Sequence, residues 1–345
     1  MPRQLFILGY PHDVGGAGTE LWHTLKLWRR MRWRLTLIPT WQADPRWQRR
    51  LSAIGCTTHH ATPATLHTVP GLTGATVFSM CNARFLEVAP RLRMLGCRLI
   101  WAGCMNWLFP AERQFYGRHG PFDRHVFQSR FQRDRLLPQL RRFGYRDEQG
   151  AVIRGAFDAA EFPFQPRPHR PDEALVIGRI SRAAPEKFHR QTWRIYGRTP
   201  YPVVARVLGW SAAVRREVGP PPRWAEVWPA GTREPRELLG ELHALVHAGG
   251  RATENWPRIG LEAMAAGVPL VVDDRGGWSE MIHHGRTGFL CQSADDFAFY
   301  TALLARDERR RQRVVRAARE SLGRDLAPPR QIAAKWQRLL SGRVY

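Results

Sequence analysis

The feature that most constrains the fold is an alternation between short apolar runs and longer amphipathic segments, which occurs in both halves of the chain. In the first half the apolar runs cover 5–9, 34–39, 75–79, 98–101 and 125–128, and helices are expected over 19–31 and 129–143. In the second half strands are expected at 175–180, 203–208, 224–228 and 270–274, with helices over 236–239, 258–266, 294–304, 308–322 and 328–345, whereas 242–248 fits a buried strand or a tight turn. Apolar runs joined by helices are typical of parallel sheets with helical crossovers. The sequence therefore predicts an α/β fold.

A proline-rich segment separates the two alternating halves. Residues 164–171 hold three prolines, which can continue neither a helix nor a central strand. A chain of 345 residues is also too long for one ordinary core. We predict two doubly wound Rossmann-like domains, 1–163 and 173–325, a linker at 164–172, and a last helix within 326–345 that packs back toward the first domain. Because ligands of such sheets bind beyond the carboxyl ends of the strands, we expect the domains to face a ligand-binding cleft.

Cysteine content and hydropathy indicate where the protein works. Five cysteines without CxxC spacing point to a reducing compartment, and they argue against a disulfide framework or a structural zinc site. No segment approaches the ~18 to 20 uncharged apolar residues that cross a bilayer. The apolar run at 5–9 has no signal-peptide cleavage site behind it and reads as a first strand. We expect a cytoplasmic protein.

The formal charge of +23 has two interpretations. Nearly all of the positive charge is arginine, since the chain has lysine only at Lys26, Lys187 and Lys335, and a GC-rich genome produces such a bias without any functional cause. Alternatively, the charge serves an anionic partner. No nucleic-acid-binding motif is present, so within this second interpretation we favour peripheral contact with an anionic membrane, through basic clusters at 29–34, 46–50, 118–142 and 306–319.

Two glutamates frame the start of a predicted helix in the second half. The segment reads Glu254-Asn-Trp-Pro-Arg-Ile-Gly-Leu-Glu262, and a proline at 257 suits a first helical turn. The N–H groups near Arg258 and Ile259 then point out of the positive end of the helix dipole, which is an anion site. Glu262 could accept hydrogen bonds from the two hydroxyls of a ribose, and Glu254 from another diol.

Two cations stand at the end of the strand at 175–180 and in the loop after it. They are Arg179 and, eight residues later, Lys187, in the run Gly-Arg-Ile-Ser-Arg-Ala-Ala-Pro-Glu-Lys. Two cations on a diphosphate would neutralise the charge that builds on it as a leaving group. Lys187 stands out because lysine is so rare in this chain.

These motifs together resemble those of the retaining GT-B glycosyltransferases, in particular glycosyltransferase family 4, also called group 1. The first resembles the E-x7-E signature of that family, and the second resembles its donor loop. The resemblance implies that Glu262 holds the nucleotide ribose, that Glu254 contacts hydroxyls of the donor sugar, and that Arg179 and Lys187 bind the diphosphate. It assigns catalytic roles to Glu254, Arg179 and Lys187, and donor binding to Arg258, Ile259 and Glu262.

Further likenesses lie outside these two motifs. Of the glycines at 15, 16 and 18, Gly16 best matches the family's glycine loop against the donor phosphates, and Gly276-Gly277 resembles a segment that we expect to be structural. The acceptor side is least alike, because the run at 101–107 lacks the histidine that often stands there. Asn106 or Cys104 could take that place, and His12 with Asp13 is the alternative.

The implied reaction is sugar transfer from a nucleotide sugar with retention of anomeric configuration. No Asp-x-Asp motif stands in a fitting place, and cations with a helix dipole already cover the phosphates, so we predict no metal and no cofactor. The base would stack near 227–231, but these residues do not choose between uridine and guanosine, and the acceptor could be a glycan, a lipid-linked sugar or a small molecule. Two rivals remain: another GT-B enzyme such as a sugar-nucleotide epimerase or a phosphorylase, and a non-catalytic binder of anionic polymers.

Overall fold

A computed structural model describes residues 4–13, 15–40 and 44–341 of the chain. Contacts divide these residues into two compact units. Unit 1 contains the described residues of Met1–Asp13, Ala17–Phe157 and Pro329–Tyr345, and unit 2 contains those of Val14–Gly16 and Asp158–Pro328. The first boundary falls a few residues before the proline-rich segment, which runs without helix or strand into unit 2.

Unit 1 is built on a fully parallel sheet of seven strands in the order β3-β2-β1-β4-β5-β6-β7. The strands are β1 (Gln4–Leu8), β2 (Arg34–Ile38), β3 (Thr57–Thr58), β4 (Thr76–Met80), β5 (Arg98–Ala102), β6 (Arg124–Phe127) and β7 (Gly150–Val152). The order reverses between β1 and β4, as it does in a Rossmann-like fold. Its central strands are apolar because helices cover both faces of the sheet.

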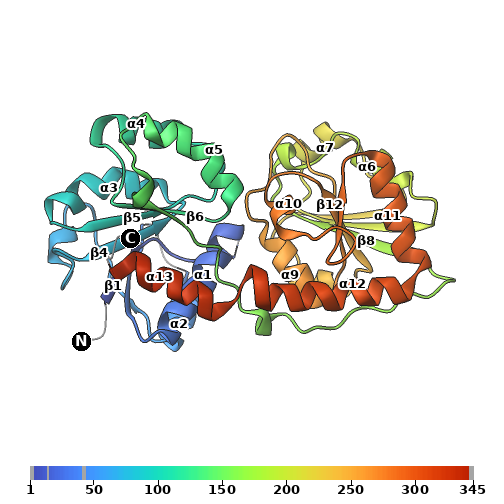
Figure 1. Cartoon of the computed structure of the whole chain (residues 1–345), viewed down its shortest axis with the longest axis horizontal. Coiled ribbons are helices and arrows are strands. Elements are labelled where there is room, and N and C mark those ends of the chain that lie inside the picture. Colours follow the sequence, from blue (N-terminus) through green and yellow to red (C-terminus); the bar gives the residue numbers. More distant parts are fainter. Residues whose placement is uncertain (1–3, 14, 41–43, 342–345) are drawn as a thin grey trace. The chain divides into compact units, whose positions relative to one another are not determined.

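The helices of unit 1 lie on both faces of its sheet (Figure 1). They are α1 (Gly16–Arg30), α2 (Pro45–Ala53), α3 (Ala83–Met94), α4 (Pro110–His119), α5 (Arg130–Arg141) and α13 (Pro329–Ser341). Figure 1 shows α3, α4 and α5 over one face and α1, α2 and α13 over the other. Short turns of 3-10 helix occur at Leu66–Thr68 and Asp147–Gln149. The predicted helices 19–31 and 129–143 correspond to α1 and α5.

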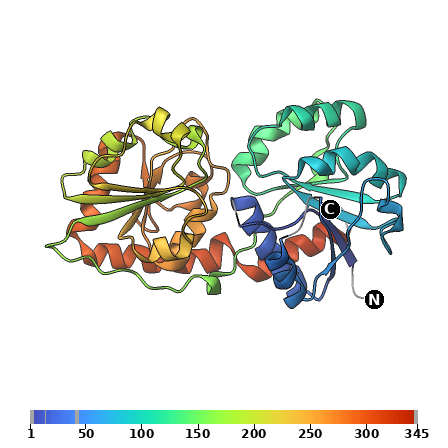
Figure 2. The ribbon, with the colours of Figure 1, turned by 180° about the vertical axis from the view of Figure 1, so that it is seen from behind.

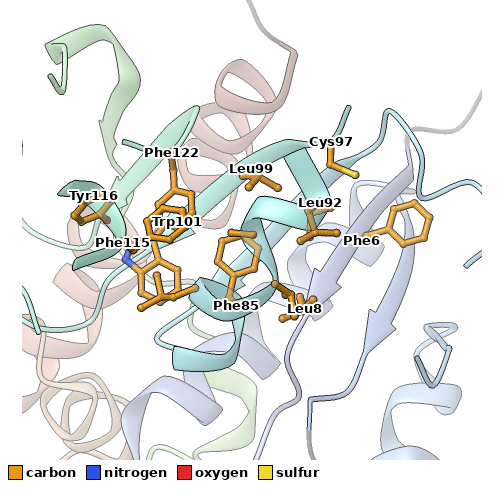
Figure 3. Close-up of a cluster of buried hydrophobic side chains, with 14 of the residues drawn as sticks. Phe6, Leu8, Phe85, Leu92, Cys97, Leu99, Trp101, Phe115, Tyr116 and Phe122 are labelled. Carbon is orange, nitrogen blue, oxygen red and sulfur yellow. The ribbon is translucent and has the colours of Figure 1, made fainter. Parts of the chain in front are cut away.

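An aromatic cluster forms the core under α3 and α4 (Figure 3). Phe85 on α3 stacks on Trp101 of β5 with ring centroids 5.8 Å apart, and Phe115 stacks on Phe122 at 4.7 Å. The indole Nε1 of Trp101 donates to Glu112 Oε1 at 3.0 Å, so this buried N–H is satisfied. These contacts hold the carboxyl end of β5 in place.

The end of the chain returns to unit 1 as α13, which lies beside α1 in both ribbon views (Figures 1 and 2). Trp336 of α13 packs edge-on against Trp28 of α1, with ring centroids 4.9 Å apart, and also against Phe78 of β4 at 5.6 Å. All three rings are buried. The last helix is therefore part of the core of unit 1.

Unit 2 repeats the arrangement with six parallel strands in the order β10-β9-β8-β11-β12-β13. The strands are β8 (Leu175–Ile180), β9 (Val203–Leu208), β10 (Ala225–Trp228), β11 (Ala244–His247), β12 (Leu270–Asp273) and β13 (Phe289–Cys291). The helices are α6 (Thr192–Gly197), α7 (Ala212–Val218), α8 (Pro235–Gly240), α9 (Arg258–Ala266), α10 (Gly277–Met281), α11 (Ala294–Arg306) and α12 (Glu308–Ser321), with 3-10 turns at Ala159–Glu161 and Pro185–Lys187 and a π-helical turn at Leu322–Leu326. The ambiguous segment 242–248 contains a buried strand, β11.

The prediction of two doubly wound Rossmann-like domains is confirmed. In unit 2, helix α9 packs against α8 and α12, while α6 packs against α11. Leu261, Met264 and Ala265 of α9 are fully buried. Among the described helices none is both long and apolar enough to cross a membrane.

Candidate functional site

The two predicted donor motifs meet at the carboxyl edge of the sheet in unit 2. Strands β8 and β11 are neighbours, with Ala244 opposite Ile177, so the loops that follow them lie side by side. Lys187 ends the 3-10 turn after β8, and Glu254 lies between β11 and α9. Lys187 Nζ is 2.7 Å from Glu254 Oε1 and 3.0 Å from Oε2, and both side chains are 17% exposed. A half-buried ion pair thus joins residues that are 67 positions apart.

Arg179 does not present its charge to solvent. Its side chain is fully buried, its Nη1 donates to the Ala248 carbonyl at 2.9 Å, and its Nη2 donates to the Lys187 carbonyl at 2.5 Å. The guanidinium also lies over the Phe188 ring, 4.4 Å from its centroid. This geometry differs from the direct diphosphate contact that the sequence predicted, because both Nη groups of the guanidinium already donate to backbone carbonyls. In this structure Arg179 fixes the loop that carries Lys187.

His247, the last residue of β11, lies behind the ion pair and was not identified from the sequence. It is 1% exposed, and neither ring nitrogen has a hydrogen-bond partner among the described residues. Its Nε2 is 3.7 Å from Glu254 Oε1. Burial, and then the charges of Arg179, Lys187 and Arg275, hold the pKa of His247 well below its usual value, so the ring is neutral. A polar residue at the carboxyl end of a buried strand was the available signal.

Helix α9 begins where the sequence predicted, with Pro257 as its N-cap and Arg258 as its first residue. Arg258 is buried and Ile259 is half-buried. The helix ends at Gly267, whose φ of 85° is the left-handed conformation that glycine adopts readily at this position. The positive end of the α9 dipole therefore lies three residues after Glu254 in the same loop.

Glu262 lies one turn into α9 and is half-buried. Its carboxylate makes no hydrogen bond or ion pair with the part of the chain that the structure describes. Burial raises the pKa of Glu262 above its ordinary value; the Arg258 charge opposes this shift and the Glu161 charge adds to it. A desolvated carboxylate with free acceptor sites suits a ligand that donates hydroxyl hydrogens.

The Gly276-Gly277 turn packs directly on the segment that carries Glu254. The Gly277 N–H donates to the Glu254 carbonyl at 2.8 Å, and a Cβ at position 277 would lie 1.8 Å from the Asn255 carbonyl oxygen. Only glycine fits such a close approach of two backbones. The turn therefore has the structural role that we expected for it, which is to support the loop before α9.

A cavity of about 910 Å³ opens beside this site at the carboxyl ends of β11, β12 and β13. Its lining includes the charged side chains of Arg190, Arg251, Asp273 and Arg275. It reaches Phe188 and the glycines at 249 and 250, but Lys187 and Glu254 are not among its lining residues. The ion pair thus lies next to the cavity and not within it.

The other predicted residues lie at the sheet edge and first turn of unit 1 or at the start of α1. Asn106 is buried after β5, His12 is exposed in the turn after β1, and Gly16 is exposed at the start of α1. Close packing requires a glycine at position 18, because a Cβ there would be 2.2 Å from the His12 carbonyl oxygen.

One group of side chains has the composition of a metal site. Ligand atoms of His169, Glu173 and His243 lie within 4.8 Å of one another. However, the Nδ1 of His243 accepts a hydrogen bond from the Val176 N–H at 2.9 Å, which places the ring proton on Nε2, 3.4 Å from Glu173 Oε1. A protonated Nε2 cannot ligate a metal. The group is a polar cluster that joins the proline-rich segment of unit 2 to the N-terminal ends of β8 and β11.

Part of the chain matches a protein-family model. Residues 227–321 match the family model described as glycosyl transferases group 1, and this segment includes Glu254, all of α9 and the Gly276-Gly277 turn. A comparison with curated protein sequences finds no match.

Solved structures resemble the chain over nearly its whole length. HepE of Anabaena in complex with UDP-glucose has 16% sequence identity and a TM-score of 0.75, covering 99% of this chain and 100% of that one. A G117R mutant of TarM of S. aureus, in complex with fondaparinux, α-GlcNAc-glycerol and UDP, has 11% identity and a TM-score of 0.78 over 99% and 100%. Sucrose-phosphate synthase of Thermosynechococcus elongatus has 13% identity and a TM-score of 0.71 over 98% of both chains. These likenesses show the fold, and the predicted GT-B class is confirmed.

Proposed function

We propose that this protein is a glycosyltransferase that moves a sugar from a nucleotide sugar to an acceptor, with retention of anomeric configuration and without a metal. The observation that carries the proposal is the Lys187–Glu254 ion pair beside the start of α9. It combines a cation for phosphate, a carboxylate for hydroxyls and a helix dipole for negative charge at one sheet edge. The match of residues 227–321 to glycosyl transferases group 1 supports this assignment.

The ion pair itself indicates how a donor would bind. A diphosphate offers Lys187 a stronger anionic partner than Glu254 does, so the lysine exchanges the carboxylate for phosphate oxygens. Glu254 is then free to accept hydrogen bonds from hydroxyls of the donor sugar. Glu262, which has no hydrogen-bond partner among the described residues, accepts the ribose hydroxyls. One binding event thereby supplies ligands to both glutamates.

Catalysis would come from the same groups. As the bond between sugar and diphosphate breaks, negative charge builds on the leaving group, and Lys187 with the N–H groups at the start of α9 stabilises it. Arg179 contributes as a positioning residue, because it holds the Lys187 carbonyl and the Ala248 carbonyl together. Since these groups already neutralise the diphosphate, we propose metal independence; loss of turnover in EDTA with recovery on adding a divalent cation would contradict it.

For the donor we propose a UDP-sugar, because HepE and the TarM mutant both appear in complexes that contain UDP or UDP-glucose. The acceptor is proposed to contact unit 1, where Asn106 and His12 remain the candidates beyond β5 and β1. We also propose peripheral contact with an anionic membrane through the exposed arginines 309, 313 and 316 of α12.

The experiment that tests the function has two steps. Thermal unfolding is first measured with UDP, GDP and a panel of their sugars; stabilisation by UDP and UDP-sugars is expected. Products are then analysed with the stabilising donor. Transfer to an acceptor or slow hydrolysis to UDP and free sugar supports a transferase, an epimerised nucleotide sugar supports an epimerase, and a sugar phosphate supports a phosphorylase. No stabilisation by any nucleotide would favour a non-catalytic binder and overturn the proposal.

A further inference from the structure

Two cysteines lie together at the carboxyl edge of the sheet in unit 1. Cys81 directly follows β4, and Cys104 comes two residues after β5. The two strands are neighbours, with Met80 opposite Ala102, and the Cys81 N–H donates to the Ala102 carbonyl at 3.0 Å. Continuing this register sets Cys81 opposite Gly103, one residue before Cys104, and strands about 4.8 Å apart keep such a diagonal pair within the Cα separation that a disulfide can span. The topology thus brings residues 23 positions apart within reach of one bond.

Cys104 already contacts the Cys81 sulfur. The Cys104 backbone N–H donates to Cys81 Sγ at 2.7 Å. Gln128 Nε2 lies 3.5 Å from Cys104 Sγ and steadies that sulfur from the other side. Neither residue is part of a disulfide.

The pair is also asymmetric in a way that suits thiol chemistry. Cys81 is exposed and has a φ of 47°, which is uncommon for a residue other than glycine. Cys104 is half-buried, and the adjacent Cys81 side chain together with burial raises the pKa of its thiol well above the usual value. Cys81 is therefore the sulfur that a solute meets first, with Cys104 behind it. The other three cysteines, at positions 56, 97 and 291, are buried.

We propose that Cys81 and Cys104 form a reversible dithiol–disulfide site that is oxidised by low-molecular-weight disulfides. Cys81 sulfur attacks one sulfur of the small disulfide, forming a mixed disulfide and releasing the first small thiol, which takes up the Cys81 proton. Cys104 sulfur then attacks Cys81 sulfur, releasing the second small thiol with the Cys104 proton. In total two protein thiols are oxidised to one disulfide, and one small disulfide is reduced to two thiols.

The disulfide would tie the β4–α3 turn to the β5–α4 connection, which also carries Asn106. Oxidation would then restrain the segment that we assign to the acceptor. This consequence rests on the proposed transferase function, whereas formation of the disulfide does not. In a reducing compartment such a bond is transient and reports the redox state.

The test exposes the native, full-length protein to defined ratios of oxidised and reduced glutathione, alkylates the remaining thiols and digests with trypsin. Cys104 lies in the tryptic peptide 99–113, and Cys81 shares the peptide 51–84 with Cys56, so fragment-ion sequencing assigns the linked sulfur. We expect a Cys81–Cys104 cross-link, while the buried cysteines are alkylated only after unfolding.

The variants Cys104→Ser and Cys81→Ser make the result specific. Cys104→Ser should accumulate glutathione on Cys81 because the resolving thiol is gone, whereas Cys81→Ser should give neither cross-link nor adduct at Cys104. The proposal is overturned if the folded wild-type protein collects glutathione on Cys81 without forming the cross-link, or if the cross-link forms only in denaturant. Loss of nucleotide-induced stabilisation would affect the proposed function and leave this result untouched.

Discussion

Lys187 Nζ lies 2.7 Å from Glu254 Oε1, and this contact joins the loop after β8 to the loop before α9. Each residue belongs to a separate sequence motif, and the pairing shows that the fold brings the two motifs together. Because both side chains are only 17% exposed, the pair is more than a surface ion pair. In the proposed function this place needs both charges, the cation for the diphosphate and the anion for the sugar hydroxyls.

The first prediction concerns the coupling of this pair. Lys187→Met leaves the half-buried Glu254 without its cation and should lower the free energy of unfolding by about 1–3 kcal/mol. Glu254→Gln should cost a similar amount, and the double variant should cost less than the sum of the two. Urea unfolding of the four proteins measures the coupling energy.

A matched control is the Arg84–Glu87 pair, whose 2.8 Å separation is almost the same but whose side chains are 65% and 56% exposed. The coupling energy of this control pair should be about 0.2–1 kcal/mol.

The variants at 187 and 254 also test catalysis: Lys187→Met should reduce turnover by ~10²-fold or more. Additive unfolding energies at 187 and 254, or full turnover in Lys187→Met, would contradict the assignment.

The second prediction separates a positioning role of Arg179 from direct ligand contact. Lysine cannot reproduce the two donors that bind the Ala248 and Lys187 carbonyls, so Arg179→Lys should lower the free energy of unfolding by about 2–4 kcal/mol. Nucleotide affinity should fall with it, because the Lys187 loop loses its support. Calorimetric titration with UDP beside thermal unfolding checks this; weaker binding with an unchanged melting temperature would instead indicate direct contact.

The sequence predicted the secondary structure better than the arrangement of side chains at the candidate site. The period of the apolar runs predicted the two parallel sheets without the short strands β3, β7 and β13, and helix α9 begins and ends at the predicted residues. The helices that were not identified are α2, α3, α4, α6, α7 and α10; of these, α3 contains Pro90, which interrupts the helical pattern. The motif pattern named Lys187, Glu254 and Glu262, but it could not reveal which way Arg179 points. That direction depends on the carbonyls of Ala248 and Lys187, which are brought to Arg179 only by tertiary packing.

The third prediction follows from the raised pKa of Glu262. An acid whose pKa is higher in the folded state adds stability below its unfolded-state pKa and loses that contribution as the pH rises through the folded-state value. At neutral pH the ionised carboxylate is therefore a cost, and Glu262→Gln should raise the melting temperature. The same change should weaken UDP binding, because glutamine offers the ribose hydroxyls one uncharged acceptor oxygen.

The pH dependence of binding gives a second readout for Glu262. Ribose hydroxyls donate to the ionised form, so wild-type affinity for UDP should fall as the pH falls through the raised pKa, and Glu262→Gln should lose that slope. Calorimetric titration at several pH values measures both. An unchanged slope in the variant would remove Glu262 from the nucleotide site.

The fourth prediction concerns acid stability. His125 is buried in β6, makes no hydrogen bond with any described residue and stacks on Phe127 at 4.4 Å. Burial lowers its pKa to about 3, so between the unfolded value and about pH 3 only the unfolded chain binds this proton. Within that window the free energy of unfolding should fall by about 1.4 kcal/mol for each unit by which the pH is lowered, on account of this one ring. His125→Phe should move the midpoint of acid unfolding to lower pH, whereas the same replacement at exposed His60 serves as the control.

The last prediction tests the membrane interpretation of the high positive charge. Arg309, Arg313 and Arg316 lie on one face of α12, are exposed, and make no hydrogen bond or ion pair within the described ranges 4–13, 15–40 and 44–341. Binding to vesicles that contain phosphatidylserine should exceed binding to neutral vesicles, and it should weaken with salt. Replacing these three arginines by serine should weaken binding by ~10²-fold, since each charge near the surface is worth about 1 kcal/mol.

The control removes the same charge from another surface of unit 2. Arg215, Arg216 and Arg236 are also exposed, so replacing all three by serine lowers the net charge equally without touching α12. If the arginines reflect only genomic bias, the two triple variants should lose vesicle binding to the same small extent, because then only total charge matters. If α12 is the contact surface, the α12 variant should lose binding at physiological salt while the control retains it. Equal binding of the wild-type protein to neutral and anionic vesicles would reject the membrane contact altogether.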